Sequence, residues 1–281
     1  MSTLYLVSTP IGNVEDLSPR ARRILAEVDR VAAEDTRHTG RLLDRLGIDA
    51  ELISLHRHNE AERTDRLLGW MAEGETVALV SDAGTPLVSD PGGRLVRAVR
   101  DAGHSVVPIP GPSAVLAALT ASGLPWERFA FLGFLPRRGR ERGQLLRRVA
   151  ASAETTVLFE SPERTVALLE ALVEACGEAR EASVGRELTK LHEEVRTGTL
   201  SDLLNYYRSS GVRGEVTVCV AGAAPSDAAP DRAEAPVEAQ RLLEGGMKPS
   251  AAAKEIARRF GIDRATAYGI VQEAGSRDDD E

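Results

Sequence analysis

The chain has 281 residues, 42% of them hydrophobic, and a formal net charge of -8 at pH 7. This length is enough for two domains, and the negative balance argues against a protein coated for nonspecific nucleic-acid binding. No apolar run reaches the about 18 residues of a membrane-spanning helix, and no basic segment precedes the amino-terminal apolar run, as it would in a signal peptide. We therefore expect a cytoplasmic protein.

The first part of the chain alternates short apolar runs with helical patterns. Strands are expected at residues 4–7, 31–33, 52–55, 76–80 and 105–109, and helices at residues 19–28, 41–46, 61–72 and 94–101. Residues 34–39 and 56–60 are expected to be loops. Alternation of this kind is typical of βαβ units with a largely parallel sheet. Residues 1–112 are therefore predicted to form an α/β domain.

The strand at residues 76–80 ends in two turns of small residues, SDAGTP at 81–86 and SDPGG at 89–93. Open α/β sheets bind ligands at the carboxyl ends of their strands. Gly84 would let a ligand approach the backbone closely, and the carboxylate of Asp82 is an acceptor for a donor-rich group such as a ribose. An ordinary turn made of common turn residues is the alternative.

A second α/β domain is predicted over residues 113–222. Ser113 is expected to cap a helix at 114–121, beside a rigid Pro-Gly-Pro turn where an anion could bind. Further strands are expected at 129–134, 155–159, 182–186 and 216–220, the last closing the sheet, and helices at 140–151, 165–176 and 200–209. The two domains are expected to face each other across residues 111–126, and clefts between domains are frequent ligand sites.

The last part of the chain changes character. Residues 223–236 are rich in Ala, Pro and Asp and read as a linker, and residues 276–281 form an acidic tail. Between them, helices at 237–243, 251–260 and 265–273 are expected, and the turn at Gly261 favours a helix-turn-helix-like module over residues 237–275. Nucleic-acid contact through Arg264, Thr266 and Tyr268 and simple packing remain equal alternatives.

Six arginines crowd into residues 137–148 with a single acid, Glu141. A local basic patch on an acidic chain is compatible with one polyanionic partner; a solvated helix face is the alternative. The only cysteines, Cys176 and Cys219, form no CxxC pair, so neither a disulfide framework nor a zinc site is expected. His56 and His58 alternate as on a strand but lack a third ligand, so no metal is expected.

Several common motifs are absent. The sequence contains no GxGxxG, GxxxxGK[ST], HExxH or GxSxG. Dinucleotide dehydrogenases, P-loop NTPases, zinc proteases and α/β-hydrolases therefore have no support.

Eight short motifs occur in one order along nearly the whole chain. They are TPIGN at 9–13, AEDTRHTGRLL at 33–43, HNE at 58–60, SDAGTPLVSDPG at 81–92, PGPSA at 110–114, GFLPR at 133–137, ESPER at 160–164 and RELTKLHEE at 186–194. Together they resemble the RsmI family of ribosomal RNA small-subunit 2′-O-methyltransferases, within the tetrapyrrole-methylase superfamily.

The resemblance implies two α/β domains of the tetrapyrrole-methylase type with a cleft between them, followed by the small helical module. It also implies a homodimer, S-adenosylmethionine as the methyl donor, and as acceptor the ribose 2′-hydroxyl of a cytidine in the decoding region of 16S ribosomal RNA. The donor would lie between the domains. The residues expected around it are Pro10, Asp82, Ala83, Gly84, Thr85, Pro86, Ser89, Pro112, Ser113, Ala114, Phe159, Glu160, Leu188 and Gly214.

A ribose hydroxyl is a poor nucleophile and gains from a general base or from a cation that stabilises the developing alkoxide. Our candidates for these roles are Glu34, Arg37, Glu187, Lys190 and Glu193. If residues 187–194 are helical, Lys190 shares a face with Glu187 and Glu193; a surface ion-pair cluster is the alternative.

RNA backbone contacts are expected first from the arginine cluster at residues 137–148, with Arg137, Arg138 and Arg140 selected from it, and next from Arg37 and the terminal helical module. His58 and Asn59 are expected to hydrogen-bond around a loop or to an RNA phosphate. Two other functions remain open. A methyltransferase acting on a small tetrapyrrole predicts a roomy, apolar cleft. A nucleic-acid-binding protein without enzymatic activity predicts binding that does not depend on the donor.

Overall fold

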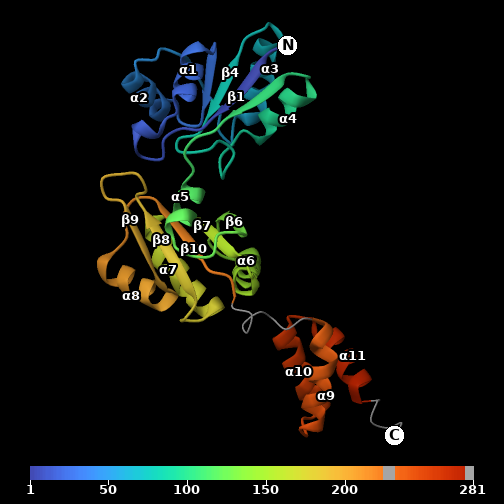
Figure 1. Cartoon of the computed structure of the whole chain (residues 1–281). Helices are drawn as coiled ribbons and strands as arrows, with labels where there is room; N and C mark the ends of the chain where they lie inside the picture. The colour runs from blue at the N-terminus through green and yellow to red at the C-terminus, as the bar shows by residue number, and fades with distance from the viewer. Residues whose placement is uncertain (224–231, 276–281) are drawn as a thin grey trace. The chain divides into compact units, whose positions relative to one another are not determined.

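A computed structural model of the chain describes residues 1–223 and 232–275. They form two compact units, one of residues 1–150 and 154–222, the other of residues 151–153 and those from Ala223 onward (Figure 1). Most of the predicted linker, residues 224–231, and the whole predicted acidic tail lie outside the described residues.

The first half of the larger unit contains a five-stranded sheet in the order β3-β2-β4-β1-β5. Every pair of neighbouring strands is parallel, so the predicted parallel sheet is confirmed. The strands are β1 (Thr3–Val7), β2 (Arg30–Ala33), β3 (Glu51–Ser54), β4 (Val77–Val80) and β5 (Ser105–Ile109), and between them run a short 3-10 turn η1 (Val14–Asp16) and the helices α1 (Pro19–Glu27), α2 (Thr36–Leu46), α3 (Glu60–Ala72) and α4 (Gly93–Asp101).

Helices cover both faces of this sheet, as Figure 1 shows for α1 and α2 on one side and α3 and α4 on the other. In β4, Ala78 and Val80 pack in the cluster that includes α1 and α2 side chains, whereas Val77 and Leu79 pack in the cluster with α3 and α4. Because both faces are buried, the strand reads as an unbroken apolar run. The carboxyl ends of β1, β2 and β4 are therefore the places where polar residues can gather.

The start of α2 differs from our prediction. The helix begins at Thr36, not Arg41, because the carboxylate of Asp35 accepts hydrogen bonds from the backbone N–H groups of Arg37 and His38. An aspartate at this position satisfies donors that the first helical turn leaves unpaired. The predicted loop at residues 34–39 is thus mostly the cap and first turn of a helix.

The second half of the larger unit contains a mixed sheet in the order β6-β7-β10-β8-β9. The pair of β6 and β7 is parallel and the other three pairs are antiparallel. Its elements are α5 (Ala114–Ala121), β6 (Phe129–Phe134), α6 (Arg140–Ala151), β7 (Thr155–Glu160), α7 (Pro162–Cys176), β8 (Glu181–Arg186), β9 (Glu194–Thr199), α8 (Leu200–Ser210) and β10 (Val216–Val220). The last strand, β10, occupies the middle of the sheet, and all its residues are buried.

We did not predict β9, an edge strand with the sequence EVRTGT. It pairs antiparallel with β8, and Glu194 bonds the guanidinium of Arg186 and the hydroxyl of Tyr207, at 3.1 and 3.2 Å. The charged residues and Gly198 interrupt the apolar alternation by which a strand is recognised in a sequence. The segment from Glu187 to Glu193 is the turn between β8 and β9, so the helical face considered for Glu187, Lys190 and Glu193 does not exist.

One apolar cluster joins the two halves of the larger unit. Ile11, in the loop after β1, packs in a cluster with Leu188 from the turn after β8, with Val115 of α5, and with the partly buried Val88 and Phe159. The loops that follow β1, β4 and β8 therefore pack against one another where the two halves meet.

The smaller unit contains a short 3-10 turn, η2 (Arg232–Glu234), and three helices, α9 (Ala235–Glu244), α10 (Pro249–Phe260) and α11 (Arg264–Gly275). They share a core that includes Ile256, Phe260 and Val271. Gly261 ends α10 in a left-handed conformation, and Asp263 caps α11, so the expected short turn between the two helices is present. Nowhere in residues 1–223 and 232–275 is a helix long and apolar enough to cross a membrane.

Candidate functional site

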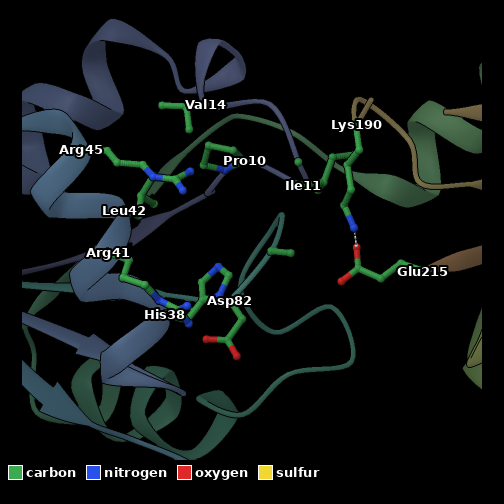
Figure 2. A pocket seen from close by; sticks show the side chains of 12 residues that line it. Pro10, Ile11, Val14, His38, Arg41, Leu42, Arg45, Asp82, Lys190 and Glu215 are labelled. Carbon is green, nitrogen blue, oxygen red and sulfur yellow. Dashed lines mark hydrogen bonds and ion pairs between the residues drawn. The ribbon is translucent and has the colours of Figure 1, made fainter. Parts of the chain in front are cut away.

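A pocket of about 290 Å³ opens where the loops after β1 and β4 meet α2 and the turn after β8 (Figure 2). We call it the cleft pocket. Its volume is near the lower end of the about 300–1,000 Å³ of small-molecule sites. The residues that line it are Pro10, Ile11, Gly12, Val14, His38, Arg41, Leu42, Arg45, Asp82, Ala83, Lys190 and Glu215.

The loops after β1 and β4 are held together by backbone hydrogen bonds. Thr9 and Gly84 exchange two of them, at 2.9 and 3.1 Å. Gly84 has φ of +84°, and a Cβ at this position would lie 3.2 Å from the side chain of Ile11 and 3.5 Å from the carbonyl oxygen of Pro112. Glycine is therefore favoured at Gly84 by the backbone conformation, and the tight approach of Ile11 leaves little space for a side chain.

Asp82 connects the β4 loop with α2. Its carboxylate accepts a hydrogen bond of 3.1 Å from the backbone N–H of Asp35, the residue that caps α2. With its start fixed in this way, α2 turns one face towards the cleft pocket. That face carries His38, Arg41 and Arg45, whose side chains are seen around the pocket in Figure 2.

Our sequence reasoning missed this basic face. Residues 38, 41 and 45 share one side of a helix because they are three and four positions apart, but only if the helix starts before residue 38. Asp35, followed by Thr36, was the available cap signal. Arg37, which we had selected, instead pairs with Asp35 at 3.1 Å, and its side chain is 87% exposed.

The opposite wall of the cleft pocket carries an ion-pair network. The ammonium group of Lys190 lies 2.7 Å from the carboxylate of Glu187 and 2.8 Å from that of Glu215. Burial alone would lower the pKa of Lys190, but the hydrogen bonds to these two carboxylates outweigh it and leave the pKa raised. The hydrogen bond from Lys190 lowers the pKa of Glu187. Lys190 thus stays a cation at neutral pH, and Glu187 is a weakened base.

Two glycines make room for this network. A Cβ on Gly12 would collide with the side chain of Lys190, and one on Gly214 would collide with that of Glu187. Gly214, which we expected beside the donor, thus lies against Glu187.

Backbone strain is concentrated in two loops. Among the described residues, the non-glycine residues with positive φ are Leu87, Ser89, Glu187 and Thr189. The first two flank Val88 and the last two flank Leu188, and both flanked residues belong to the apolar cluster that joins the halves. Such conformations cost about 1–3 kcal/mol each and gather at ligand sites.

Carboxylates gather where β2 and β4 end. Burial raises the pKa of Glu34, and the nearby charge of Asp82 raises it further. Burial, Glu34 and Asp82 together raise the pKa of Asp90 to about 6. The guanidinium of Arg57, which donates to the carbonyl of Ser89 at 3.1 Å, opposes both shifts. Within the described part of the chain, no three His, Cys, Asp or Glu residues are placed to share a metal ion.

The remaining residues of our predicted donor site divide into two groups. The Thr85 hydroxyl donates to Pro112 at 3.2 Å, and Ser113 caps α5 as predicted. Ala114, Phe159 and Leu188 lie in the cluster that contains Ile11, as does Val88, the neighbour of Ser89. Glu160, by contrast, is buried in an ion pair of 2.9 Å with Arg164 at the start of α7.

Two residues of the HNE motif, Asn59 and Glu60, make hydrogen bonds that hold loops in place. The side chain of Asn59 accepts from the backbone N–H of His56 and donates to the carbonyl of Ser54, at 2.8 and 3.2 Å, which closes the turn between β3 and α3. Glu60 accepts from the N–H groups of Gly92 and Arg94 at the start of α4. The other residues that we predicted to contact RNA are all exposed: His58, Arg137, Arg138 and Arg140.

Comparisons with known proteins agree on one family. The profile of the tetrapyrrole (corrin/porphyrin) methylases matches residues 3–204. The ribosomal RNA small subunit methyltransferase I of Mesorhizobium japonicum is 48% identical over 269 residues, which cover 94% of this chain and 90% of that protein. The protein of the same name from Synechocystis is 44% identical over 275 residues, covering 97% and 98%.

Solved structures support the same fold. Uroporphyrin-III-C-methyltransferase from Thermus thermophilus superposes with a TM-score of 0.55 at 27% identity, covering 78% of this chain and 94% of that one. A structure of uroporphyrin-III C-methyltransferase from the same organism, complexed with S-adenyl homocysteine, gives a TM-score of 0.58 at 22% identity, covering 78% and 97%. This chain belongs to the tetrapyrrole (corrin/porphyrin) methylase family and, within it, to the ribosomal RNA small subunit methyltransferase I proteins.

Proposed function

We propose that this chain is an S-adenosylmethionine-dependent methyltransferase that modifies the 2′-hydroxyl of a cytidine ribose in the decoding region of 16S ribosomal RNA. Relatives named ribosomal RNA small subunit methyltransferase I, 44% and 48% identical over nearly the whole chain, support the reaction and the RNA. The single structural observation that carries the proposal is the cleft pocket, because it combines a basic helix face with a carboxylate suited to sugar hydroxyls.

The residues of the cleft fit S-adenosylmethionine. This donor supplies a methyl group already activated by a positively charged sulfur. The backbone at Ala83 and Gly84 has no large side chain, and Asp82 presents a carboxylate to ribose hydroxyls. The carboxyl of Glu34, whose pKa is raised by burial and by Asp82, and that of Asp90, whose pKa is raised by burial, Glu34 and Asp82, favour a nearby cation. We assign the donor to these loops together with residues 112–114 and Leu188.

Positioning supplies much of the acceleration, on the order of 7–11 kcal/mol in favourable cases. Within this scheme Glu34 is the proton acceptor, because its raised pKa makes it a better base than an exposed carboxylate. Lys190 remains charged and stabilises negative charge that develops on the ribose oxygen. Glu187 positions Lys190 through the 2.7 Å contact.

The RNA meets the basic face of α2. His38, Arg41 and Arg45 bind phosphates beside the target nucleotide, and Arg37 contacts the backbone at the rim. Arg137, Arg138, Arg140 and His58 extend the contact, while Asn59 shapes the loop that carries His58. The natural substrate in this proposal is the small ribosomal subunit, met in the cytoplasm by a homodimer.

The proposed methyltransferase activity assigns a role to each part of the chain. Residues 1–112 and 113–222 form the two catalytic domains, and residues 237–275 form a module that assists RNA binding. The tetrapyrrole alternative is disfavoured because relatives that match nearly the whole chain are named ribosomal RNA small subunit methyltransferase I, and because a pocket of about 290 Å³ is not the roomy cleft that this alternative predicts.

Transfer of tritium from labelled donor tests the proposal. Small subunits that lack the modification are incubated with the protein and donor, and the labelled RNA is mapped with nucleases. We expect label on the sugar of one cytidine in the decoding region. Label on a base, or no incorporation, would reject the proposal. Large ribosomal subunits serve as the control substrate and should remain unlabelled.

A further inference from the structure

A second hollow, of about 470 Å³, lies between the β6–α6 connection and the start of α7, and it shares no lining residue with the cleft pocket. We call it the arginine pocket. Three of its residues carry a guanidinium group and one carries a carboxylate. The lining consists of Arg137, Arg142, Ser161, Glu163, Arg164 and Ala167.

Two of the three guanidinium groups are held in place by the fold. Arg142 donates to the carbonyl of Pro136 at 3.1 Å. Arg164 donates to the carbonyl of Leu135 at 2.7 Å and pairs with the buried Glu160 at 2.9 Å. Because a guanidinium has five N–H donors, each of these side chains keeps donors for a ligand. A preorganised arginine loses less freedom for each further hydrogen bond that it makes.

The third guanidinium is free. Arg137 is exposed, and within the described ranges it takes part in no hydrogen bond or ion pair. The hollow also borders the first turn of α7, where the helix dipole favours an anion. Ser161, the cap residue of this helix, makes no capping hydrogen bond with its side chain. Glu163 is the one opposing charge in the lining.

We propose that the arginine pocket binds a backbone phosphate of the RNA substrate, away from the nucleotide that is methylated. Phosphate matches the forked geometry of arginine, which makes paired hydrogen bonds to it. The chain as a whole is acidic, with a net charge of -8, so RNA needs a locally basic surface to approach it. The choice of RNA as the source of the phosphate rests on the proposed function.

The lining of the arginine pocket changes which arginines we assign to RNA contact. Of the six arginines at residues 137–148, only Arg137 and Arg142 line the hollow, and Arg164 joins them from α7. Arg147 and Arg148 lie on the same helix as Arg142 but outside the lining. They offer controls for Arg137, since they are exposed arginines of the same cluster that lie outside the hollow.

The test compares Arg137→Ala with Arg147→Ala and Arg148→Ala. Binding to isolated small subunits is measured without donor over a series of salt concentrations, and thermal melting checks the fold. We expect Arg137→Ala to weaken binding about tenfold, and the loss of one phosphate contact to reduce the slope of log K against log salt concentration by about one. The control variants should bind like the wild type. Equal losses in all three variants, or no loss in Arg137→Ala, would overturn the proposal.

Steady-state kinetics and a phosphate titration complete the design. In methyl transfer, Arg137→Ala should raise KM for the subunit and leave kcat unchanged; a fall in kcat alone would contradict a remote contact. Inorganic phosphate should compete with subunits for the wild type and not for Arg137→Ala. If phosphate binding is lost and subunit binding is not, the pocket serves a free anion and the RNA assignment fails. Because binding is measured without donor, this result is independent of whether methyl transfer occurs.

Discussion

The two halves of the larger unit serve the cleft pocket in different ways because their sheets are built differently. In the first half every strand is parallel, so the ends of β2 and β4 meet at one edge and bring Glu34 and Asp82 together. The second half is mostly antiparallel and contributes the turn after β8, which carries Glu187 and Lys190, together with Glu215, which directly precedes β10. A parallel sheet brings together groups from distant segments, whereas the hairpin turn places Glu187 and Lys190 close together in a backbone that is strained at Glu187 and Thr189.

The largest effect is expected from Gly84→Val, which distorts the loop after β4 in the first half. A branched side chain meets both a φ of +84° and the side chain of Ile11, so we expect a loss of about 2–4 kcal/mol in unfolding free energy and weaker donor binding. Gly74→Val is the matched control, because Gly74 has φ of +103° with open space around it. It should lower stability less and leave donor affinity unchanged. Denaturant unfolding and calorimetry provide the two readouts, and normal donor binding by Gly84→Val would refute this role of the loop.

Lys190→Met tests the cation that the second half contributes to the cleft pocket. It removes the cation and keeps the length of the side chain, and loss of one such stabilising group typically costs about 100-fold or more in kcat. Donor affinity should change little. Arg208→Met, which breaks the exposed pair with Glu170, is the control. It should leave kcat unchanged because Arg208 does not line the cleft pocket, and it should cost only about 0–1 kcal/mol of stability because the pair is exposed. A kcat for Lys190→Met within twofold of the wild type would remove Lys190 from the mechanism.

A cap substitution tests how the first half orients its basic face. Asp35→Ala removes the cap of α2, and Ser18→Ala removes that of α1, where Ser18 accepts from the N–H of Ala21 at 3.1 Å. Both should lose about 1 kcal/mol in unfolding free energy. Only Asp35→Ala should also raise KM for the small subunit, because α2 carries His38, Arg41 and Arg45 into the pocket. Equal kinetics for the two variants would argue against this role of α2.

The smallest effect concerns Asp90 and pH. The pKa of Asp90 is raised from 3.8 to about 6, so its carboxyl binds a proton more tightly in the folded chain. Its contribution to stability is therefore full below pH 3.8, is lost as the pH rises through about 6, and stays absent above. Because the side chain is only partly buried and the charge of Arg57 opposes the shift, we expect Asp90→Asn to gain only about 1 kcal/mol at pH 8 and nothing at pH 4. Unfolding at both pH values measures this difference, and an equal effect at the two would contradict the shift.

Much of the first half could be predicted from sequence because its signals are local. The apolar run of β4 and the Ser-Pro start of α1 specify their own elements. The site needed tertiary information. Arg37 and Arg41 look alike in the sequence, and only the cap at Asp35 decides which of them faces the pocket.

In the second half the sequence was less informative, since β9 has no apolar alternation and is stabilised by its pairing with β8 and by the hydrogen bond between Glu194 and Tyr207, which the sequence pattern does not show. Glu215 illustrates the same limit. It reaches Lys190 from a segment 25 residues away, through the pairing of β10 with β8. No spacing in the sequence could have revealed that contact.

The central claim is that groups from both halves act on one ribose oxygen. Single-turnover methyl transfer to small subunits by Glu34→Gln, Lys190→Met and the double variant tests this directly. If both groups act on the same oxygen, the double variant will be about as slow as the slower single variant, because groups that act as a unit are not additive. If the two losses simply multiply, the halves act independently and the claim is contradicted.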